Sequence, residues 1–270
     1  MQTIRPADLA RPTRHIFLSP HYDDIALSCG GTAALLARAG RTPEIALIFG
    51  DHPDPAQPMT DFAVGMHRSW GMSAEQVVAG RRSGEQVAAL TLGACDRFLP
   101  FRDAIYRGSR YLSDDDLFGD THLEEAELPE QIVRHLGLER TPPATVRVYA
   151  PLAIGGHVDH QHAERAGRLL AKRGYAVWYY EDLPYALRPE NVDRRRPQLD
   201  PELAPRLYVE IESVWTTKVD AIMAYPSQLP TIFEQYVGVR ATRLGIEGAM
   251  GDYARTMGDG TLAERFWTAS

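Results

Sequence analysis

Cysteine is scarce in this sequence, and long hydrophobic runs are missing. The 270 residues include two cysteines, Cys29 and Cys95. No apolar stretch approaches the roughly 20 residues that span a bilayer. Residues 1–14 are polar and carry two prolines, unlike a signal peptide. We therefore expect a cytoplasmic protein with reduced thiols and no membrane partner.

Positive charge is also in short supply. Lysine and arginine number 29 against 36 acidic residues, so the net charge is −7. This balance argues against nucleic acid or an anionic membrane as the main partner. The triplet 194–196 is Arg-Arg-Arg, but Asp193 and Pro197 flank it. We interpret this triplet as a solvated loop rather than a polyanion site.

Apolar runs alternate with helical patterns along most of the chain. Buried strands are predicted over residues 15–18, 45–49, 97–99, 145–150 and 176–180. Helices are predicted over 32–38, 73–92, 124–138, 161–173, 214–225 and 229–237. The alternation predicts an α/β fold with a mainly parallel sheet. We expect one domain, 1–270, with a Pro-rich excursion around 186–206 and a weakly periodic Gly-rich final segment of about thirty residues.

Two histidine–aspartate clusters follow predicted strands. The first is Ser19-Pro20-His21-Tyr22-Asp23-Asp24, and the second is Gly156-His157-Val158-Asp159-His160-Gln161. Ligands bind outside the carboxyl ends of parallel strands, so we expect the clusters to meet there. Asp51 and the pair Glu181-Asp182 end two further strands at the same edge.

The residue types in these clusters suit a metal-dependent hydrolase. His21 and Asp24 are positioned to share a divalent ion, and His160 is the natural third ligand. Asp23 is then left to accept a proton from metal-bound water. His157 is left to stabilise charge on a substrate oxygen, and Asp159 to orient an imidazole. The alternative is that His21 caps a turn and the two aspartates serve a helix N-terminus.

The motifs resemble those of the PIG-L/LmbE family of zinc-dependent N-deacetylases. The resemblance rests on Pro20–Asp24, on Gly30-Gly31-Thr32 and on His157–His160, and it covers about residues 14–182. It implies a Rossmann-like three-layer sandwich, one Zn²⁺ per chain and removal of an N-acetyl group from an amino sugar or glycoside. It also implies that His21, Asp24 and His160 bind the metal, that Asp23 is the general base and that His157 stabilises the tetrahedral intermediate.

The chain departs from the family pattern at several positions. Tyr22 stands where proline is usual, Ile25 where glutamate is usual, and Val158 where proline is common. Gly155 occupies a position that is tyrosine in some members. None of these changes removes a predicted ligand, so the chemistry transfers better than the substrate.

Substrate contacts are predicted more weakly. Arg82, with Glu85, resembles a helix that faces the site in the family, although a solvent-exposed pair explains both residues equally well. Ser28 is interpreted as a helix N-cap in preference to a sugar contact. Asp51, Glu181 and Tyr185 are further candidates because they lie at strand ends.

Alternatives to the deacetylase remain. One is an amidase that removes a larger acyl group from a thiol conjugate or a natural product. Another is a non-catalytic module that binds a sugar or nucleotide. A nicotinamide dehydrogenase is disfavoured because no Gly-x-Gly-x-x-Gly follows the first strand. A nucleophilic Cys29 is disfavoured against a packing role, and association into a homo-oligomer is left open.

Overall fold

The protein is built on one eight-stranded sheet. The computed structural model describes residues 2–269. The strand order is β1-β7-β8-β6-β5-β2-β3-β4, and of these strands β8 alone runs against its neighbours. The strands are β1 (Gln2–Thr3), β2 (Arg14–Ser19), β3 (Glu44–Asp51), β4 (Cys95–Arg102), β5 (Val146–Pro151), β6 (Ala176–Tyr180), β7 (Ala204–Glu210) and β8 (Ala263–Thr268).

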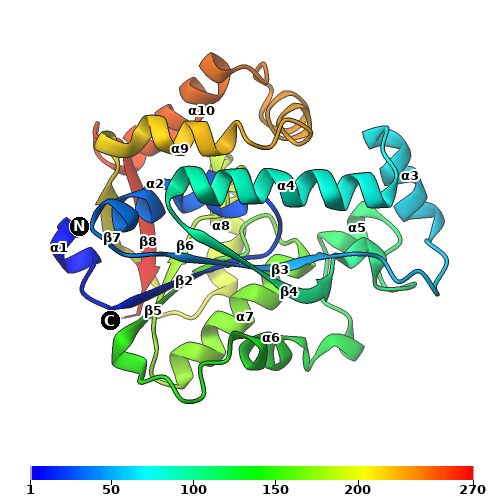
Figure 1. Cartoon of the computed structure of the whole chain (residues 1–270), viewed down its shortest axis with the longest axis horizontal. Helices are drawn as coiled ribbons and strands as arrows, with labels where there is room; N and C mark the ends of the chain where they lie inside the picture. Colours follow the sequence, from blue (N-terminus) through cyan, green and yellow to red (C-terminus); the bar gives the residue numbers. More distant parts are fainter. Residues whose placement is uncertain (1, 270) are drawn as a thin grey trace.

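Helices cover both faces of the sheet, which gives three layers (Figure 1). One face carries α2 (Asp24–Arg38), α4 (Ala74–Leu92), α9 (Trp215–Ile222) and α10 (Arg243–Met257), and the other carries α6 (Leu128–Leu136) and α7 (Val158–Lys172). The remaining helices are α1 (Pro6–Leu9), α3 (Asp61–Trp70), α5 (Asp114–Leu117), α8 (Pro189–Arg195) and the π-helical segment η7 (Pro230–Val237). Short 3-10 turns are η1 (Ala104–Tyr106), η2 (Leu123–Glu125), η3 (Pro143–Thr145), η4 (Tyr185–Leu187), η5 (Arg196–Gln198) and η6 (Glu212–Val214). In the described chain, no helix has both the length and the apolar character that crossing a membrane requires.

The predicted α/β fold is confirmed, although β1, β7 and α3 were not predicted and three further regions differ from the prediction. Helix α2 begins at Asp24, well before the predicted residue 32. Helix α7 begins at Val158, so the second histidine cluster occupies the start of a helix. No helix or strand was predicted in the final segment, which contains α10 and the strand β8. Strand β8 is specified by pairing with β6 and β7, which a local pattern does not reveal.

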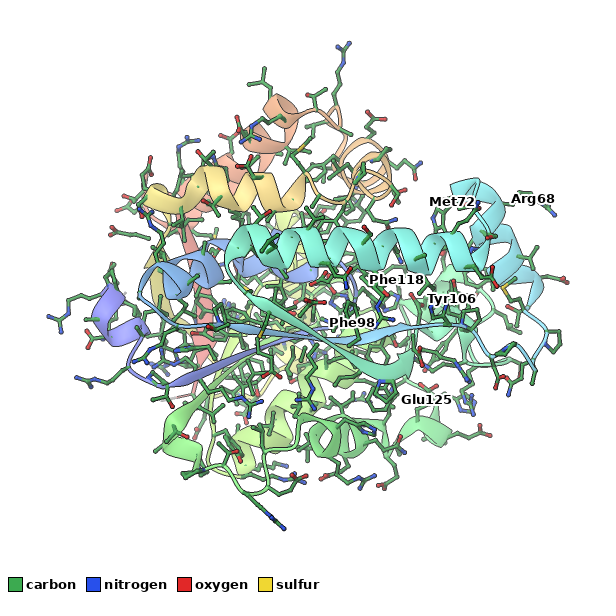
Figure 2. All side chains as sticks on the ribbon, in the orientation of Figure 1. Arg68, Met72, Phe98, Tyr106, Phe118 and Glu125 are labelled. Atoms are coloured by element: carbon green, nitrogen blue, oxygen red, sulfur yellow. The ribbon has the colours of Figure 1, made fainter. Side chains whose placement is uncertain are left out.

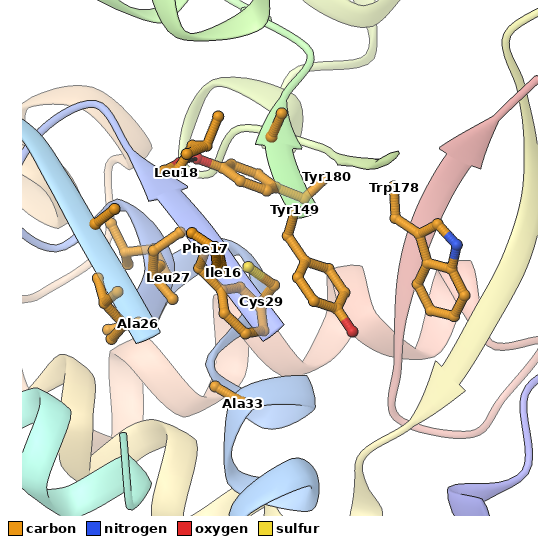
Figure 3. Close-up of a cluster of buried hydrophobic side chains, with 14 of the residues drawn as sticks. Ile16, Phe17, Leu18, Ala26, Leu27, Cys29, Ala33, Tyr149, Trp178 and Tyr180 are labelled. Carbon is orange, nitrogen blue, oxygen red and sulfur yellow. Dashed lines mark hydrogen bonds between the residues drawn. The ribbon is translucent and has the colours of Figure 1, made fainter. Parts of the chain in front are cut away.

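The hydrophobic core lies on both faces of the sheet, under α2 on one side and under α6 and α7 on the other. Phe17 of β2 stacks on Tyr149 of β5 with ring centroids 4.0 Å apart, and Cys29 packs in the same cluster (Figure 3). All three side chains are fully buried. Burial and the nearby Glu264 raise the pKa of the Cys29 thiol well above its ordinary value. A protonated, enclosed thiol agrees with the packing role expected for Cys29.

Helix α2 is kinked in the middle, and a buried glutamate stabilises the kink. Cys29 has φ −144°, which interrupts the helix. Beyond it, the backbone N–H groups of Gly31 and Thr32 donate to the carboxylate of Glu264 on β8, at 2.9 and 2.7 Å. Lys218 of α9 donates to the same carboxylate at 2.6 Å. A Cβ at residue 31 would lie 2.6 Å from Cγ2 of Ile211, so only glycine fits where α2 packs against Ile211.

Removing the Glu264 carboxylate should therefore destabilise the fold strongly. Glu264→Ala leaves a buried ammonium and two helix N–H groups without a partner, so we expect a loss of about 3–5 kcal/mol in the free energy of unfolding. Urea denaturation measures this. Glu210→Ala, an exposed glutamate of the neighbouring strand, is the control and should stay within about 0.5 kcal/mol. Equal losses in the two variants would contradict the role given to Glu264.

Candidate active site

The two histidine–aspartate clusters meet at the point where the strand order reverses. Strand β2 lies between β5 and β3, so the chain winds outward from β2 in both directions. The first cluster follows β2, and the second follows β5. Because β2 and β5 are adjacent and parallel, their carboxyl ends lie side by side. This reversal point is where open α/β sheets bind ligands.

Asp24 lies between two imidazoles. Its Oδ2 atom is 3.9 Å from Nδ1 of His21 and 3.5 Å from Nε2 of His160. A ligand atom of each residue lies within 4.8 Å of those of the other two, which marks the trio as a possible metal-binding group. Ligand atoms of a tetrahedral zinc lie about 3.3 Å apart, since each bond is about 2.0–2.1 Å. The two distances from Asp24 are about 0.2–0.6 Å wider than this spacing.

Each of these imidazoles is hydrogen-bonded to a carboxylate through the ring nitrogen that faces away from Asp24. Nε2 of His21 is 2.9 Å from Oδ2 of Asp159, and Nδ1 of His160 is 2.7 Å from Oδ1 of Asp182. The nitrogen that faces Asp24 is the other one in both rings. Ligating histidines are oriented in this way, with one nitrogen on a carboxylate and the other on the metal. The donor set therefore fits a divalent metal.

Asp159 is itself held by a buried arginine. Arg107 donates to Oδ1 of Asp159 at 2.5 Å and pairs with Glu125 at 2.8 Å. This partner and His21 keep the pKa of Asp159 far below its ordinary value although burial opposes ionisation. For His21, burial lowers the pKa, but the surrounding carboxylates, led by Asp159, raise it to about 9. His21 and Asp159 also form, with His157, a second group within metal-binding distances.

Asp23 has an unusual backbone. Its φ of 79° is left-handed, a conformation that aspartate tolerates better than most residues. Its N–H donates to Oε2 of Glu85 on α4, at 3.4 Å, and the hydroxyl of Tyr225 donates to the same oxygen at 2.7 Å. Burial and the adjacent Asp24 raise the pKa of Asp23 to about 8. A nearby divalent cation favours the ionised form, which can accept a proton.

His157 is the N-cap of α7. Its Nδ1 accepts the backbone N–H of Asp159 at 3.2 Å, which leaves Nε2 as the protonated nitrogen of the neutral ring. Burial, followed by the charge of His21, holds the pKa of His157 well below its ordinary value. The environment favours a neutral ring that donates a hydrogen bond from Nε2.

A cavity of about 730 Å³ opens over these residues. His21, Asp23, Asp24, His157 and His160 all line it. The lining also includes residues from α3, α5, α8 and η7. Figure 2 shows one lining residue, Phe118, on the side of the molecule where α3 and α5 lie.

Tyr185 is a predicted contact residue that does line the cavity. Its ring lies edge-on to His160, with centroids 5.8 Å apart. It also fills the space beside Gly155, because a Cβ there would be 2.6 Å from Cγ of Tyr185. Tyr180, the other tyrosine at this strand end, instead donates its hydroxyl to the carbonyl of Leu18. A tyrosine therefore stands next to position 155, supplied by another segment.

The other predicted substrate contacts lie elsewhere. Arg82 stacks on Phe98, with the guanidinium 4.0 Å from the ring centroid. Ser28 is inside α2, is not an N-cap, and accepts the N–H of Leu183. Asp51 accepts the N–H of His52 outside the cavity. These three predictions are not supported by the structure.

Glu181 is also directed away from the cavity. Its carboxylate accepts hydrogen bonds from Arg265 and Trp267, each at 2.8 Å, and from Tyr253. The prediction of a substrate contact at Glu181 was therefore wrong. Successive side chains point in opposite directions near a strand end, and the next residue, Asp182, is the one that reaches His160.

Four residues near the site had no role assigned from the sequence. They are Arg81, Asp103, Arg107 and Asp182. Asp103 directly follows β4, so the strand-end argument would have found it; its Oδ2 is 3.9 Å from Nε2 of His21. Arg81 lines the cavity in place of its neighbour Arg82. Arg107 lies in a loop, and no local pattern marks it.

The fold and this site define an α/β protein with a possible His/Asp metal centre at the sheet's reversal point. A model of the PIG-L family, described as GlcNAc-PI de-N-acetylase, matches residues 16–171. The chain belongs to this family.

Individual relatives are consistent with that assignment. A 2'-N-acetylparomamine deacetylase of Streptomyces fradiae is 31% identical over 227 residues, covering 81% of this chain and 74% of the relative. A protein of the same description from Niallia circulans is 31% identical over 189 residues; the match covers 63% of this chain and 66% of that relative's length. The crystal structure of A40926 pseudoaglycone deacetylase has a TM-score of 0.71 and 27% identity, covering 96% of this chain and 98% of that one.

The contact between the Asp182 carboxylate and His160 provides a test of the metal centre. Asp182→Asn keeps the side chain's shape but weakens its hold on the imidazole, so we expect zinc affinity to fall about 10- to 100-fold. Competition with a chromogenic chelator measures this. Asp252→Asn, whose side chain is 84% exposed on α10, should bind zinc as the unchanged protein does. Unchanged affinity in Asp182→Asn would show that this contact does not orient a ligand.

Proposed function

We propose that this protein is a zinc-dependent hydrolase that removes an N-acetyl group from an amino sugar or glycoside. The observation that carries the proposal is the pair of imidazoles, each held by a carboxylate, that face Asp24 beside a large cavity. Relatives described as 2'-N-acetylparomamine deacetylases support the reaction type. The products are a free amine and a carboxylate.

One zinc ion per chain is proposed, with His21 Nδ1, Asp24 and His160 Nε2 as its ligands. When bound, zinc lowers the pKa of its water and polarises the acyl carbonyl. Asp159 and Asp182 hold the two imidazoles so that the correct nitrogen of each is presented. Arg107 holds Asp159 in turn.

The remaining residues move and stabilise charge. Asp23 accepts a proton from the attacking water and passes it to the departing amine as the acyl C–N bond breaks. His157 donates a hydrogen bond from Nε2 to the oxygen on which negative charge develops. The Nδ1 contact with the Asp159 N–H keeps the ring in the tautomer that this role requires. Tyr185 contacts the substrate from the cavity wall.

The role of Asp23 separates chemistry from metal binding. Asp23→Asn should retain about one zinc per chain, because Asp23 is not a ligand, but lose activity by at least about 100-fold. Metal content is measured by atomic absorption, and activity by amine release from N-acetylglucosaminides. Chelation should abolish the activity of the unchanged protein, and zinc should restore it.

Asp51→Asn is the matched control, because Asp51 ends the neighbouring strand but lies outside the cavity. It should keep both zinc and activity. Loss of zinc in Asp23→Asn would contradict the assignment of Asp23 as a base. Absence of amine release from every N-acetylated sugar tested, with zinc bound, would overturn the proposed function.

A further inference from the structure

Helix α8 forms part of the cavity wall and lies in the segment expected to be a Pro-rich excursion. Arg188, Asn191 and Arg194 all line the cavity. They are spaced three residues apart, at the N-cap and along the helix, so they share one face. We call these three residues the α8 face. Part of the arginine triplet thus contributes to the site.

The three arginines of the triplet have different surroundings, so the predicted solvated loop was wrong. Arg195 donates to the carbonyl of Leu152 at 2.7 Å and pairs with Glu164 at 3.5 Å. Arg196 lies over the ring of Trp267. Arg194 is exposed and faces the cavity.

The two arginines of the α8 face lack acidic partners. Within residues 2–269, no carboxylate lies within 4.0 Å of a nitrogen of Arg188 or Arg194. Arg188 donates one N–H to the carbonyl of Tyr236, and its guanidinium lies 4.1 Å from the centroid of the Tyr236 ring. Both cations line the same cavity, and an anion bound near them reduces the repulsion between like charges.

Three of the four acidic residues in the cavity lining lie near the histidines. Asp23, Asp24 and Asp103 surround the histidines, and Asp114 of α5 is the further acid in the lining. Arg81 adds a third cation to the wall, near Asp23, whose pKa it lowers against the larger effect of burial. Most of the lining carboxylates therefore lie where the metal is proposed, whereas the α8 face contributes positive charge to the lining.

A path of aromatic rings joins the two parts. The Tyr185 ring lies 5.8 Å from that of His160, and the Tyr236 ring lies 5.5 Å from that of Tyr185. The Arg188 guanidinium follows directly on Tyr236. These contacts run from His160 to the α8 face through residues that all line the cavity.

We propose that the α8 face binds an anionic group, a carboxylate or a phosphate, on the part of the substrate distal to the acyl group. The inference rests on the proposed function, because it assigns the substrate class of that same site. Planar guanidinium groups bind both kinds of anion through paired N–H donors. The preferred substrates are then acidic N-acylglycosides, and a cationic group at this end is disfavoured.

A matched series of aryl N-acetylglucosaminides tests this. The aryl group carries a 4-carboxylate, a 4-phosphonate, a neutral 4-methyl or a cationic 4-aminomethyl substituent, and kcat/KM is compared for the zinc-loaded protein. We expect one or both anionic compounds to be favoured roughly tenfold over the neutral one, and the cationic compound to be the poorest. The preference should shrink as salt concentration rises. The comparison between carboxylate and phosphonate identifies the anion.

Charge reversal then locates the effect. In the double variant Arg188→Glu/Arg194→Glu, the ratio of anionic to neutral kcat/KM should fall roughly tenfold or more. Arg134→Glu, an exposed arginine of α6 on the opposite face of the sheet, makes the same kind of charge change and should leave the ratio unchanged. Equal rates for anionic and neutral compounds, or a ratio that the double variant does not alter, would overturn the inference.

Failure of the proposed function gives a different result. If no compound is hydrolysed, titration calorimetry with the same four glycosides still measures charge preference. Tighter binding of the anionic compounds, lost in the double variant and kept in Arg134→Glu, supports the α8 face. Equal binding of all four compounds counts against it.

Discussion

The parallel pairing of β2 with β5 is the contact on which the candidate site depends. Its register places Phe17 opposite Tyr149, so Ser19 and Pro151 end the two strands together. The histidine clusters that follow are 130 or more residues apart in the chain, as the 138 residues between His21 and Asp159 show. A slip of one residue would turn alternate side chains to the wrong face and separate the clusters. The stacked core rings of Phe17 and Tyr149 stabilise the correct register.

Buried charge at this site is organised in successive pairs. His21 and Asp24 stand where a metal is proposed, Asp159 supports His21, and Arg107 with Glu125 supports Asp159. Each charge that is removed from water gains a partner of opposite sign, which offsets the cost of burial. The imidazole of His160 is hydrogen-bonded to Asp182, and Asp182 in turn accepts the N–H of Ile154 instead of pairing with an arginine. The two sides of the centre are therefore unequal in their links to the surrounding protein.

Much of the fold was predictable because strands and helices leave local patterns. The two clusters were predictable as a site because both follow strands, and strand ends share an edge. The direction of a side chain was harder to predict. Glu181 and Arg82 were chosen as site residues, whereas their neighbours Asp182 and Arg81 are the ones that reach the site. Sequence position gives the location of a residue to within one or two places, whereas direction depends on tertiary packing. The C-terminal strand was missed for a related reason, because its two neighbours lie far away in sequence.

Gly155 and Tyr185 share a single volume. The glycine has φ +92°, and any Cβ there would overlap the tyrosine ring. A larger residue at 155 therefore requires both a smaller residue at 185 and a different local backbone. Substitutions at the two positions are therefore expected to have non-additive effects on the free energy of unfolding, so the single variants do not predict the double variant. A wall of the cavity can thus be supplied from either of two chain segments, and redesign of this wall must treat them as one unit.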